Sequence, residues 1–240
     1  MSINADSMER IVPDQLQEGT TGQETLAFHL ERYEFACKHI ETGDVLDIAC
    51  GVGYGTSFLA EKNKNIHSIT GVDISAGAIQ YAKKRYQHDK INFVAADGML
   101  FQVDHKYDVI ISLETIEHVP EPEKFIDNLK RQLKPNGLMI TSVPVTPSVD
   151  ANPHHLTDFT QKSFRKIFTS RGFQEVDAFL QVQSYSPFQV AARTEPRMEQ
   201  MRKGLLKYYF QNPGSAVKRV ASVIMDGFNN KYLTVVWRNK

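Results

Sequence analysis

The sequence predicts an α/β protein with a doubly wound, mostly parallel sheet of about seven strands and helices on both faces. Short, continuously apolar segments alternate with amphipathic segments between residues 45 and 143. Each apolar segment is followed by a polar or glycine-rich turn. This alternation is typical of a parallel sheet that is buried on both faces. Right-handed crossovers then place the carboxyl ends of the strands along one edge, where ligands bind.

The spacing of apolar residues and the positions of glycine and proline predict the first elements. Residues 1–23 contain a proline and two glycines and are expected to form an N-terminal arm or lid; residues 24–240 form the main domain. Apolar residues at helical spacing predict a helix from Glu24 to about Ile40. Strands are predicted at Val45–Ala49, Ser68–Asp73, Ile91–Ala95, Tyr107–Leu113 and Leu138–Val143, with helices from Thr56, from Ser75 to Tyr86 and over Pro122–Leu133. The run Pro135-Asn136-Gly137 is predicted to end the last of these helices.

The last third of the chain shows weaker patterns. A helix is predicted over Thr160–Arg171, with strands at Phe173–Val182 and Tyr232–Trp237. Between them, residues 184–230 hold several weak helical patterns interrupted by prolines. We interpret this stretch as a helical insertion that covers a substrate site.

Composition narrows the class of protein. The 240 residues are 41% apolar, which suits one globular domain, and 28 basic residues balance 28 acidic ones. Such a balance gives no strong nucleic-acid signal, although a local basic patch remains open. The two cysteines, Cys37 and Cys50, favour a reducing compartment. Without an apolar leader or an apolar run of about 20 residues, a soluble cytoplasmic protein is expected.

The sharpest motif follows the first strand, where Asp47 precedes three alternating glycines, Gly51, Gly53 and Gly55. Glycines let a ligand approach the backbone, and the next helix offers free N–H groups. The spacing is G-x-G-x-G, unlike the G-x-G-x-x-G of dinucleotide folds. An anionic Asp47 opposes a pyrophosphate but suits the ammonium of a methionyl group.

Acidic residues end the next two strands. Asp73 can accept hydrogen bonds from two ribose hydroxyls, Ile74 can pack on an adenine face, and Asp97 can accept from an adenine amino group. Each acid alone is better explained as a helix cap or a solvated loop charge. Together with the glycine turn, they indicate a nucleoside site.

These motifs resemble the class I S-adenosylmethionine-dependent methyltransferases, which have a Rossmann-like fold. The resemblance covers about residues 24–182 and implies that Tyr232–Trp237 is the family's final, antiparallel strand. It implies S-adenosyl-L-methionine as cofactor, with S-adenosyl-L-homocysteine as product. The resemblance assigns the cofactor to Arg32, Asp47, Gly51, Gly53, Asp73, Ile74, Asp97, Gly98 and Leu113. For Arg32 it rests on the ubiquinone-type O-methyltransferases, where an arginine before the glycine motif binds the methionyl carboxylate; a solvated helix face is the alternative.

The fourth and fifth strands lead into a possible metal site. Glu114, Glu117 and His118 follow one strand, and His154 and His155 follow the other. The strands are expected to be neighbours, so mixed oxygen and nitrogen ligation by Glu114, Glu117, His118 and His155 is possible.

The same E-x-x-E-H pattern resembles a divalent-metal site of ubiquinone-type and small-RNA 2′-O-methyltransferases. Aligning Asp158-Phe159-Thr160 with a run in the latter selects His155 over His154. The segments Glu9–Pro13 and His29–Ala36 are also similar to methyltransferases of sugar and polysaccharide clusters.

Three readings of this cluster stay open. A divalent cation, Mg²⁺ or Mn²⁺, could align and activate an acceptor hydroxyl. Alternatively His118 or His155 acts as a catalytic general base without a metal, or the residues are structural.

The leading hypothesis is O-methylation of a hydroxyl on a small-molecule or glycan-type metabolite. Alternatives are N-methylation of an amino sugar or amine, methylation of a terminal RNA 2′-hydroxyl, and a non-catalytic cofactor-binding protein. A nicotinamide dehydrogenase is a weaker rival. A basic face on the insertion (Arg193, Arg197, Arg202, Lys203 and Lys207) would favour RNA, and an apolar pocket would favour a small molecule. The sequence does not predict the oligomeric state.

Overall fold

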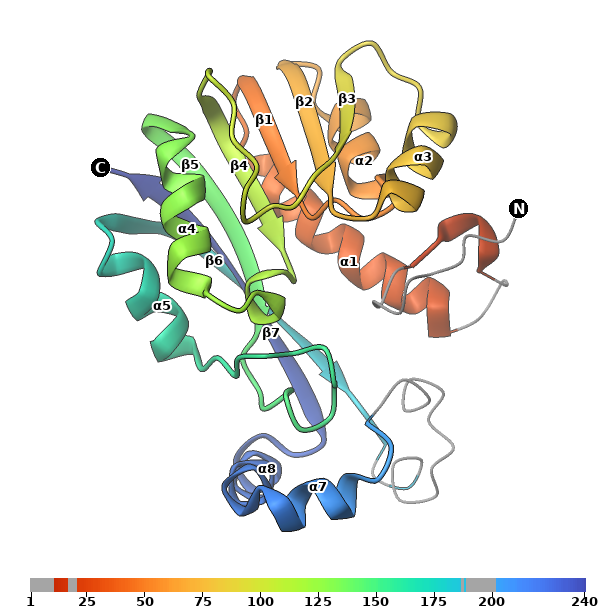
Figure 1. Ribbon diagram of the computed structural model, residues 1–240, viewed down its shortest axis with the longest axis vertical. Helices are drawn as coiled ribbons and strands as arrows, with labels where there is room; N and C mark the ends of the chain where they lie inside the picture. Colours follow the sequence, from red (N-terminus) through yellow and green to blue (C-terminus); the bar gives the residue numbers. More distant parts are fainter. Residues whose placement is uncertain (1–10, 17–20, 187, 189–201) are drawn as a thin grey trace.

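The computed structural model describes residues 11–16, 21–186, 188 and 202–240, and within these ranges seven strands form one sheet (Figure 1). The strands are β1 (Gly43–Ile48), β2 (Ile66–Asp73), β3 (Ile91–Ala95), β4 (Tyr107–Leu113), β5 (Leu133–Pro144), β6 (Phe173–Ser184) and β7 (Asn229–Asn239). Their order is β3-β2-β1-β4-β5-β7-β6. Strands β1 to β5 pair in parallel, whereas β7 pairs antiparallel with both β5 and β6. The predicted fold class is therefore confirmed.

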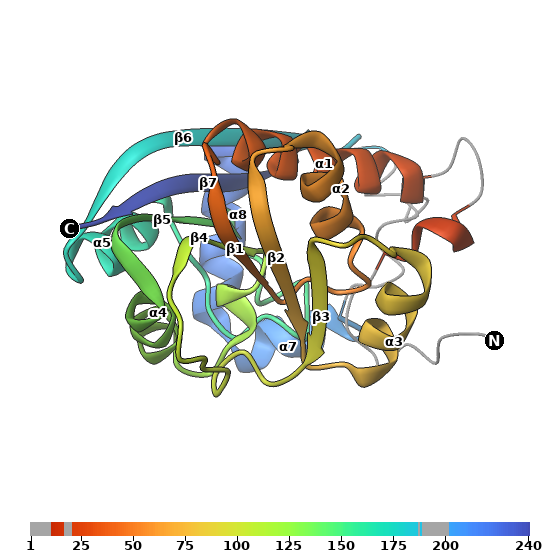
Figure 2. The ribbon, with the colours of Figure 1, turned by 90° about the horizontal axis from the view of Figure 1, so that it is seen from above.

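Helices cover both faces of this sheet. The helices of the described residues are η1 (Pro13–Gln15), α1 (Thr21–Lys38), α2 (Tyr54–Lys62), α3 (Ala76–Arg85), η2 (Ile116–His118), α4 (Pro122–Arg131), α5 (Gln161–Thr169), α7 (Leu205–Gln211) and α8 (Pro213–Asp226). Helices α1 and α2 lie on one face, and α4 and α5 lie on the other (Figure 2). Ser75 caps α3 as predicted, because its side chain accepts a hydrogen bond from the Ala78 amide.

The side chains of the central strands point alternately to the two faces of the sheet, and each face carries its own hydrophobic core layer. Val45 packs in a cluster with Leu59 of α2, whereas its neighbour Leu46 packs in a cluster with Phe125 of α4 and Phe164 of α5. Successive side chains of a strand point to opposite faces, so one short apolar segment serves both layers. This explains why the predicted strands are continuously apolar.

The end of α4 differs from the prediction. The helix ends at Arg131, with Gln132 as its C-cap, and Leu133 already pairs with Tyr107 of β4. Pro135-Asn136-Gly137 therefore does not end the helix but lies within β5, where Asn136 has a φ of +61°. The strand register shifts along this stretch, which accommodates the unusual backbone.

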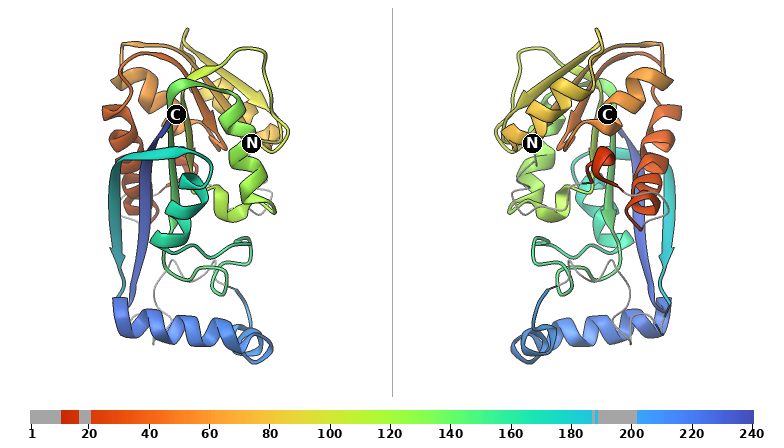
Figure 3. Two further views of the ribbon diagram at one scale, coloured as in Figure 1. Left: turned by 90° about the vertical axis from the view of Figure 1, so that its left-hand side faces the viewer. Right: turned by 90° about the vertical axis from the view of Figure 1, so that its right-hand side faces the viewer.

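Strands β6 and β7 are long, and α7 and α8 lie at their far end, away from α3 and α4 (Figure 3). Both helices lie within residues 184–230, the stretch interpreted from the sequence as an insertion, and its role as a cover of the substrate site stays a prediction. Residues 1–10 of the arm and 189–201 of the insertion lie outside the described residues. Among the helices described, none is both long and apolar enough to cross a membrane.

Candidate active site

A cavity of about 1520 Å³ opens at the carboxyl ends of the parallel strands. Its wall includes Gly51 after β1, Asp73 at the end of β2, and Glu117 and His118 after β4. Small-molecule pockets usually measure about 300 to 1,000 Å³, so this cavity has room for two ligands side by side. The wall also includes Val12 of the arm, and Tyr209 and Arg219 of the insertion.

Two glycines of the turn after β1 serve different purposes. Gly51 has a φ of +58°, and a Cβ added there would meet no atom within 4 Å, so its backbone is open to the cavity. Gly53 has a φ of +84°, and an added Cβ would lie 2.7 Å from the Phe93 ring. Gly53 is absent from the cavity wall and is needed for packing, although the sequence also assigned it to the cofactor.

Asp47 lies beneath this turn and not on the cavity wall. Its carboxylate accepts hydrogen bonds from Thr56 Oγ1 at 2.6 Å and from Tyr33 Oη at 3.4 Å. Burial raises the pKa of Asp47 to about 7, with the two hydrogen bonds opposing that rise. The contact between Asp47 and a methionyl ammonium stays a prediction; the observed role of the carboxylate is to tie α2 and α1 to β1.

Besides Gly51 and Arg32, five more of the predicted cofactor residues line the cavity: Asp73, Ile74, Asp97, Gly98 and Leu113. The Asp73 carboxylate accepts from the Gly51 amide at 3.0 Å and from the Ser75 amide at 2.8 Å. These bonds fix its orientation at the end of β2. Ile74 next to it is 58% exposed, which leaves its side chain available to a flat ring. The arrangement fits the predicted ribose and adenine contacts.

Arg32 reaches the cavity from α1 and is only 1% exposed. Its Nη1 donates to Gln181 Oε1 at 2.9 Å, and its guanidinium lies 5.4 Å and 5.2 Å from the ring centroids of Phe28 and Tyr232. A neutral amide and two rings orient the cation without neutralising it. An incoming carboxylate would therefore be bound favourably, as predicted for the methionyl end of the cofactor.

Glu117, His118 and His155 form the one group within the described residues that could hold a metal ion, with candidate ligand atoms all within 4.8 Å of one another. The two rings are nearly perpendicular, with centroids 4.5 Å apart. Glu117 is fully buried. The cluster therefore joins two segments of the chain, one after β4 and one after β5.

Hydrogen bonds orient both imidazoles. His118 Nδ1 lies 3.1 Å from the His154 carbonyl oxygen, which can only accept, so Nδ1 carries the proton and Nε2 keeps a lone pair. His155 Nδ1 lies 2.7 Å from Ser148 Oγ. Burial lowers the pKa of both histidines, that of His155 to about 3, where the charge of His118 contributes as well. A base works best with a pKa near the working pH, so His155 is better suited to ligation than to proton transfer.

Glu114, the fourth predicted ligand, lies on the cavity wall but outside this group. Its backbone has a φ of +49°, and its Oε1 accepts from Ser142 Oγ at 2.7 Å. That bond ties Glu114 to β5. His154 offers its carbonyl to His118, so the geometry agrees with the selection of His155 over His154.

A polar cluster that the sequence did not predict lies next to the loop between β5 and α5, which holds His155. Asp150 accepts from Arg219 Nη2 and from Tyr209 Oη, both at 2.6 Å. Arg202 donates to the backbone carbonyls of Val149 and Asp150. The contacts join the loop before His155 to α7 and α8. Tyr209 and Arg219 lie 59 and 69 residues after Asp150 in the sequence, so no local motif predicts these contacts.

Three of the five basic residues that would form an RNA-binding face lie within the described residues. Lys203 and Lys207 are exposed, whereas Arg202 turns inward to the loop. Arg193 and Arg197 lie outside the described residues.

Comparisons with known proteins find similar methyltransferases. Residues 46–141 match the family described as "Methyltransferase domain". A malonyl-[acyl-carrier protein] O-methyltransferase of Priestia megaterium is 36% identical over 98 residues, 41% of this chain and 35% of the relative. A ubiquinone biosynthesis O-methyltransferase of Rickettsia akari is 35% identical over 106 residues, 44% of this chain and 41% of the relative. The chain thus spans less than half the length of these two curated relatives.

Solved structures share the fold over nearly the whole chain. The N-methyltransferase NodS of Bradyrhizobium japonicum, in complex with S-adenosyl-l-homocysteine, has a TM-score of 0.62 and 16% identity, covering 99% of this chain and 96% of its own. The [4+2]-cyclase SpnF has a TM-score of 0.63 and 19% identity, covering 94% and 85%. The class I methyltransferase resemblance and the Rossmann-like fold are confirmed. A cyclase shares the fold, so the fold alone does not determine the reaction.

Proposed function

We propose that this chain, with its class I methyltransferase domain, transfers a methyl group from S-adenosylmethionine to a hydroxyl of a small-molecule or glycan-type acceptor. The observation that carries the proposal is one cavity with two sides. Asp73 and Asp97 lie at the ends of β2 and β3 on one side, the cluster of Glu117, His118 and His155 follows β4 and β5 on the other, and Arg32 lines the wall from α1. Two of the similar curated proteins are named as O-methyltransferases, which supports a hydroxyl or carboxyl oxygen as acceptor.

The cofactor side would hold the methyl donor by its polar ends. Asp73, whose carboxylate is held by the Gly51 amide, would accept from ribose hydroxyls, and Arg32, held by Gln181, would bind the carboxylate. The donor would thereby be held at both ends, which would fix the position of the sulfonium between them. Methyl transfer is an in-line displacement, so this alignment with the acceptor oxygen is the main contribution of the protein.

The acceptor side suits a divalent cation. A buried carboxylate and two neutral imidazoles are a mixed donor set that favours Mn²⁺ or Fe²⁺ over Mg²⁺, which prefers oxygen ligands. A bound cation would hold an acceptor oxygen and lower the pKa of its hydroxyl. Glu117, His118 and His155 would orient that oxygen, and the arm and insertion that line the cavity would exclude water from it.

Calorimetry tests both parts of the proposal. We expect the purified chain to bind S-adenosylhomocysteine at micromolar strength, and to bind Mn²⁺ after removal of metal with EDTA. His155→Ala should weaken Mn²⁺ binding at least about tenfold, because a ligand atom is lost. The matched control His154→Ala should change it by less than about twofold, because it keeps the carbonyl that orients His118.

The outcomes separate the two claims. A chain that binds no S-adenosylhomocysteine would overturn the methyltransferase proposal itself. Cofactor binding without any response to Mn²⁺ or Mg²⁺ would leave methyl transfer standing and overturn the metal assignment. In that case His118 becomes the candidate base, and N-methylation of an amine becomes the better reading.

A further inference from the structure

Helices α7 and α8 present apolar side chains to solvent. Leu206 and Phe210 are one turn apart on α7 and are 82% and 91% exposed. Val217, Val220 and Ile224 follow at helical spacing on α8 and are 58% to 79% exposed. A helix on a globular protein normally turns such a stripe toward the core. A row of exposed apolar side chains on each of two neighbouring helices indicates an interaction site.

Polar side chains on the side of α8 that faces the protein hold the apolar stripe toward solvent. Arg219 forms its ion pair with the buried Asp150, Ser222 is buried, and Asp226 pairs with Lys231 of β7. Rotating α8 to bury the apolar stripe would break both ion pairs and leave Asp150 buried without its cation. Such a loss is strongly destabilising, so the stripe is held outward.

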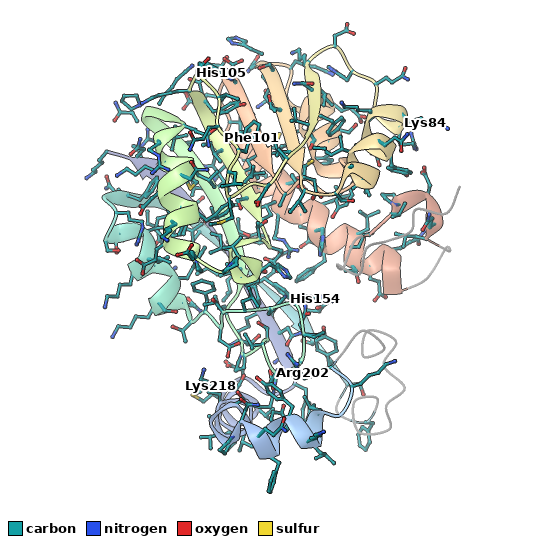
Figure 4. All side chains as sticks on the ribbon, in the orientation of Figure 1. Lys84, Phe101, His105, His154, Arg202 and Lys218 are labelled. Atoms are coloured by element: carbon teal, nitrogen blue, oxygen red, sulfur yellow. The ribbon has the colours of Figure 1, made fainter. Side chains whose placement is uncertain are left out.

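The same segment is rich in positive charge. The sequence from Arg202 to Met225 contains five basic residues and no acidic residue, although the whole chain has a formal charge of zero. Lys203, Lys207 and Lys218 are exposed beside the apolar stripes, and Lys218 also approaches Asp158 at 3.5 Å. Figure 4 shows Arg202 and Lys218 on this segment, below His154.

We propose that this α7–α8 face (Leu206, Phe210, Val217, Val220, Ile224, Lys203, Lys207 and Lys218) docks on the surface of an anionic phospholipid bilayer. An apolar stripe flanked by lysines buries its apolar side chains at the headgroup boundary and attracts anionic lipid. A second copy of this chain fits less well, because it would bring two positively charged faces together. The face lies at the far end of β6 and β7, where a flat surface can reach it (Figures 1 and 3).

Docking would also bring the cavity to the bilayer. Leu205, Tyr209 and Val223 belong to the same two helices and line the cavity from their inner side. One wall of the cavity would therefore rest on the membrane surface while the cofactor side stays at the sheet.

Vesicle co-sedimentation of the full chain tests this proposal without any activity assay. We expect binding to vesicles with about one third phosphatidylglycerol and much weaker binding to pure phosphatidylcholine, because anionic lipid attracts lysines. Lys207→Gln should weaken binding about fivefold, in line with about 1 kcal/mol for each surface lysine. The double variant Phe210→Ser/Ile224→Ser should weaken it at least about tenfold. Raising the salt from about 0.1 M to about 1 M should also release the protein.

The matched control is Leu100→Ser, a 77% exposed leucine on the loop after β3, which should leave binding unchanged. Absence of binding to anionic vesicles, or equal binding to neutral ones, would overturn the proposal. A lipid-free dimer that Phe210→Ser converts to a monomer in sedimentation analysis would also overturn it, in favour of a second copy.

Discussion

On the cofactor side of the cavity, polar groups lie at the ends of buried parallel strands, whereas on the acceptor side they lie on a loop held by appended helices. Asp73 ends β2 and bonds to Gly51, 22 residues earlier in the chain. The loop with His155 is instead tied down through Asp150, whose cation partner Arg219 lies 69 residues later. The common fold thus supports the first side directly. The second side depends on contacts particular to this chain.

Because the acceptor side depends on the contact between Asp150 and Arg219, removing that contact should destabilise the loop that holds His155. Asp150→Ala removes the carboxylate that accepts from Arg219 and Tyr209 and leaves a partly buried cation unpaired. We expect the free energy of unfolding to fall by about 3 kcal/mol, the usual loss when one partner of a buried pair is removed. Urea unfolding measures this, and hydrogen exchange should show faster exchange in residues 145–158 than in β1 or β2.

A second ion pair between the same loop and the same helix is the control. Lys218 approaches Asp158 at 3.5 Å, but its side chain is 62% exposed. Lys218→Ala should therefore lower stability by less than about 1 kcal/mol, as exposed pairs do. Equal effects of the two substitutions would show that the buried pair does not hold the acceptor side.

The cofactor side should respond to its own residues with a change in affinity and not in fold. Asp73→Asn replaces a carboxylate that would accept two hydroxyl donors from the ribose. We expect S-adenosylhomocysteine affinity to fall about 10- to 100-fold, because hydrogen bonds to a charged group are worth about 1.5 to 3 kcal/mol. Calorimetry gives the affinity, and circular dichroism checks that the fold is kept.

Asp89→Asn removes an equivalent charge from an exposed position before β3 and serves as the matched control. An unchanged affinity in Asp73→Asn would remove Asp73 from the cofactor site. It would also weaken the comparison, because the carboxylate at the end of β2 would then be structural.

The same contrast explains what could be predicted from the sequence. Strands β3 and β4 match their predicted bounds: β4 is central and largely buried, and β3, at the edge of the sheet, is bounded by the polar turn that holds Asp97. Asp73 and Asp97 could be found because Asp73 ends β2 and Asp97 comes two residues after β3. The bond between Arg32 and Gln181 joins residues 149 apart, and no periodicity constrains such a pair. The tie between Asp150 and Arg219 was missed for the same reason. The end of α4 was misplaced because Asn136 adopts a left-handed backbone within β5.

The smallest expected effect is a loss of stability at acid pH that comes from His29, beside the cofactor side of the cavity. Burial, with a contribution from the charge of Arg32, lowers the pKa of His29 on α1 to about 3, and its Nδ1 lies 2.9 Å from Tyr54 Oη. Above an unfolded pKa of about 6.5 the residue is neutral in both states and has no linkage effect. As the pH falls below 6.5, only the unfolded chain takes up the proton, so stability is lost progressively toward pH 3.

On going from about pH 7.5 to about pH 5.5, protonation of His29 in the unfolded chain should lower the free energy of unfolding by about 1.4 kcal/mol. His29→Gln should lose that much less stability over this pH range than the unsubstituted chain. The control His105→Gln, at an exposed histidine, should lose as much stability as the unsubstituted chain. Urea unfolding at both pH values, with EDTA present so that metal release does not contribute, measures the difference. If His29→Gln and the unsubstituted chain lose the same stability, His29 is protonated in the folded protein. The cofactor side would then carry a second cation beside Arg32, with a correspondingly stronger attraction for a carboxylate.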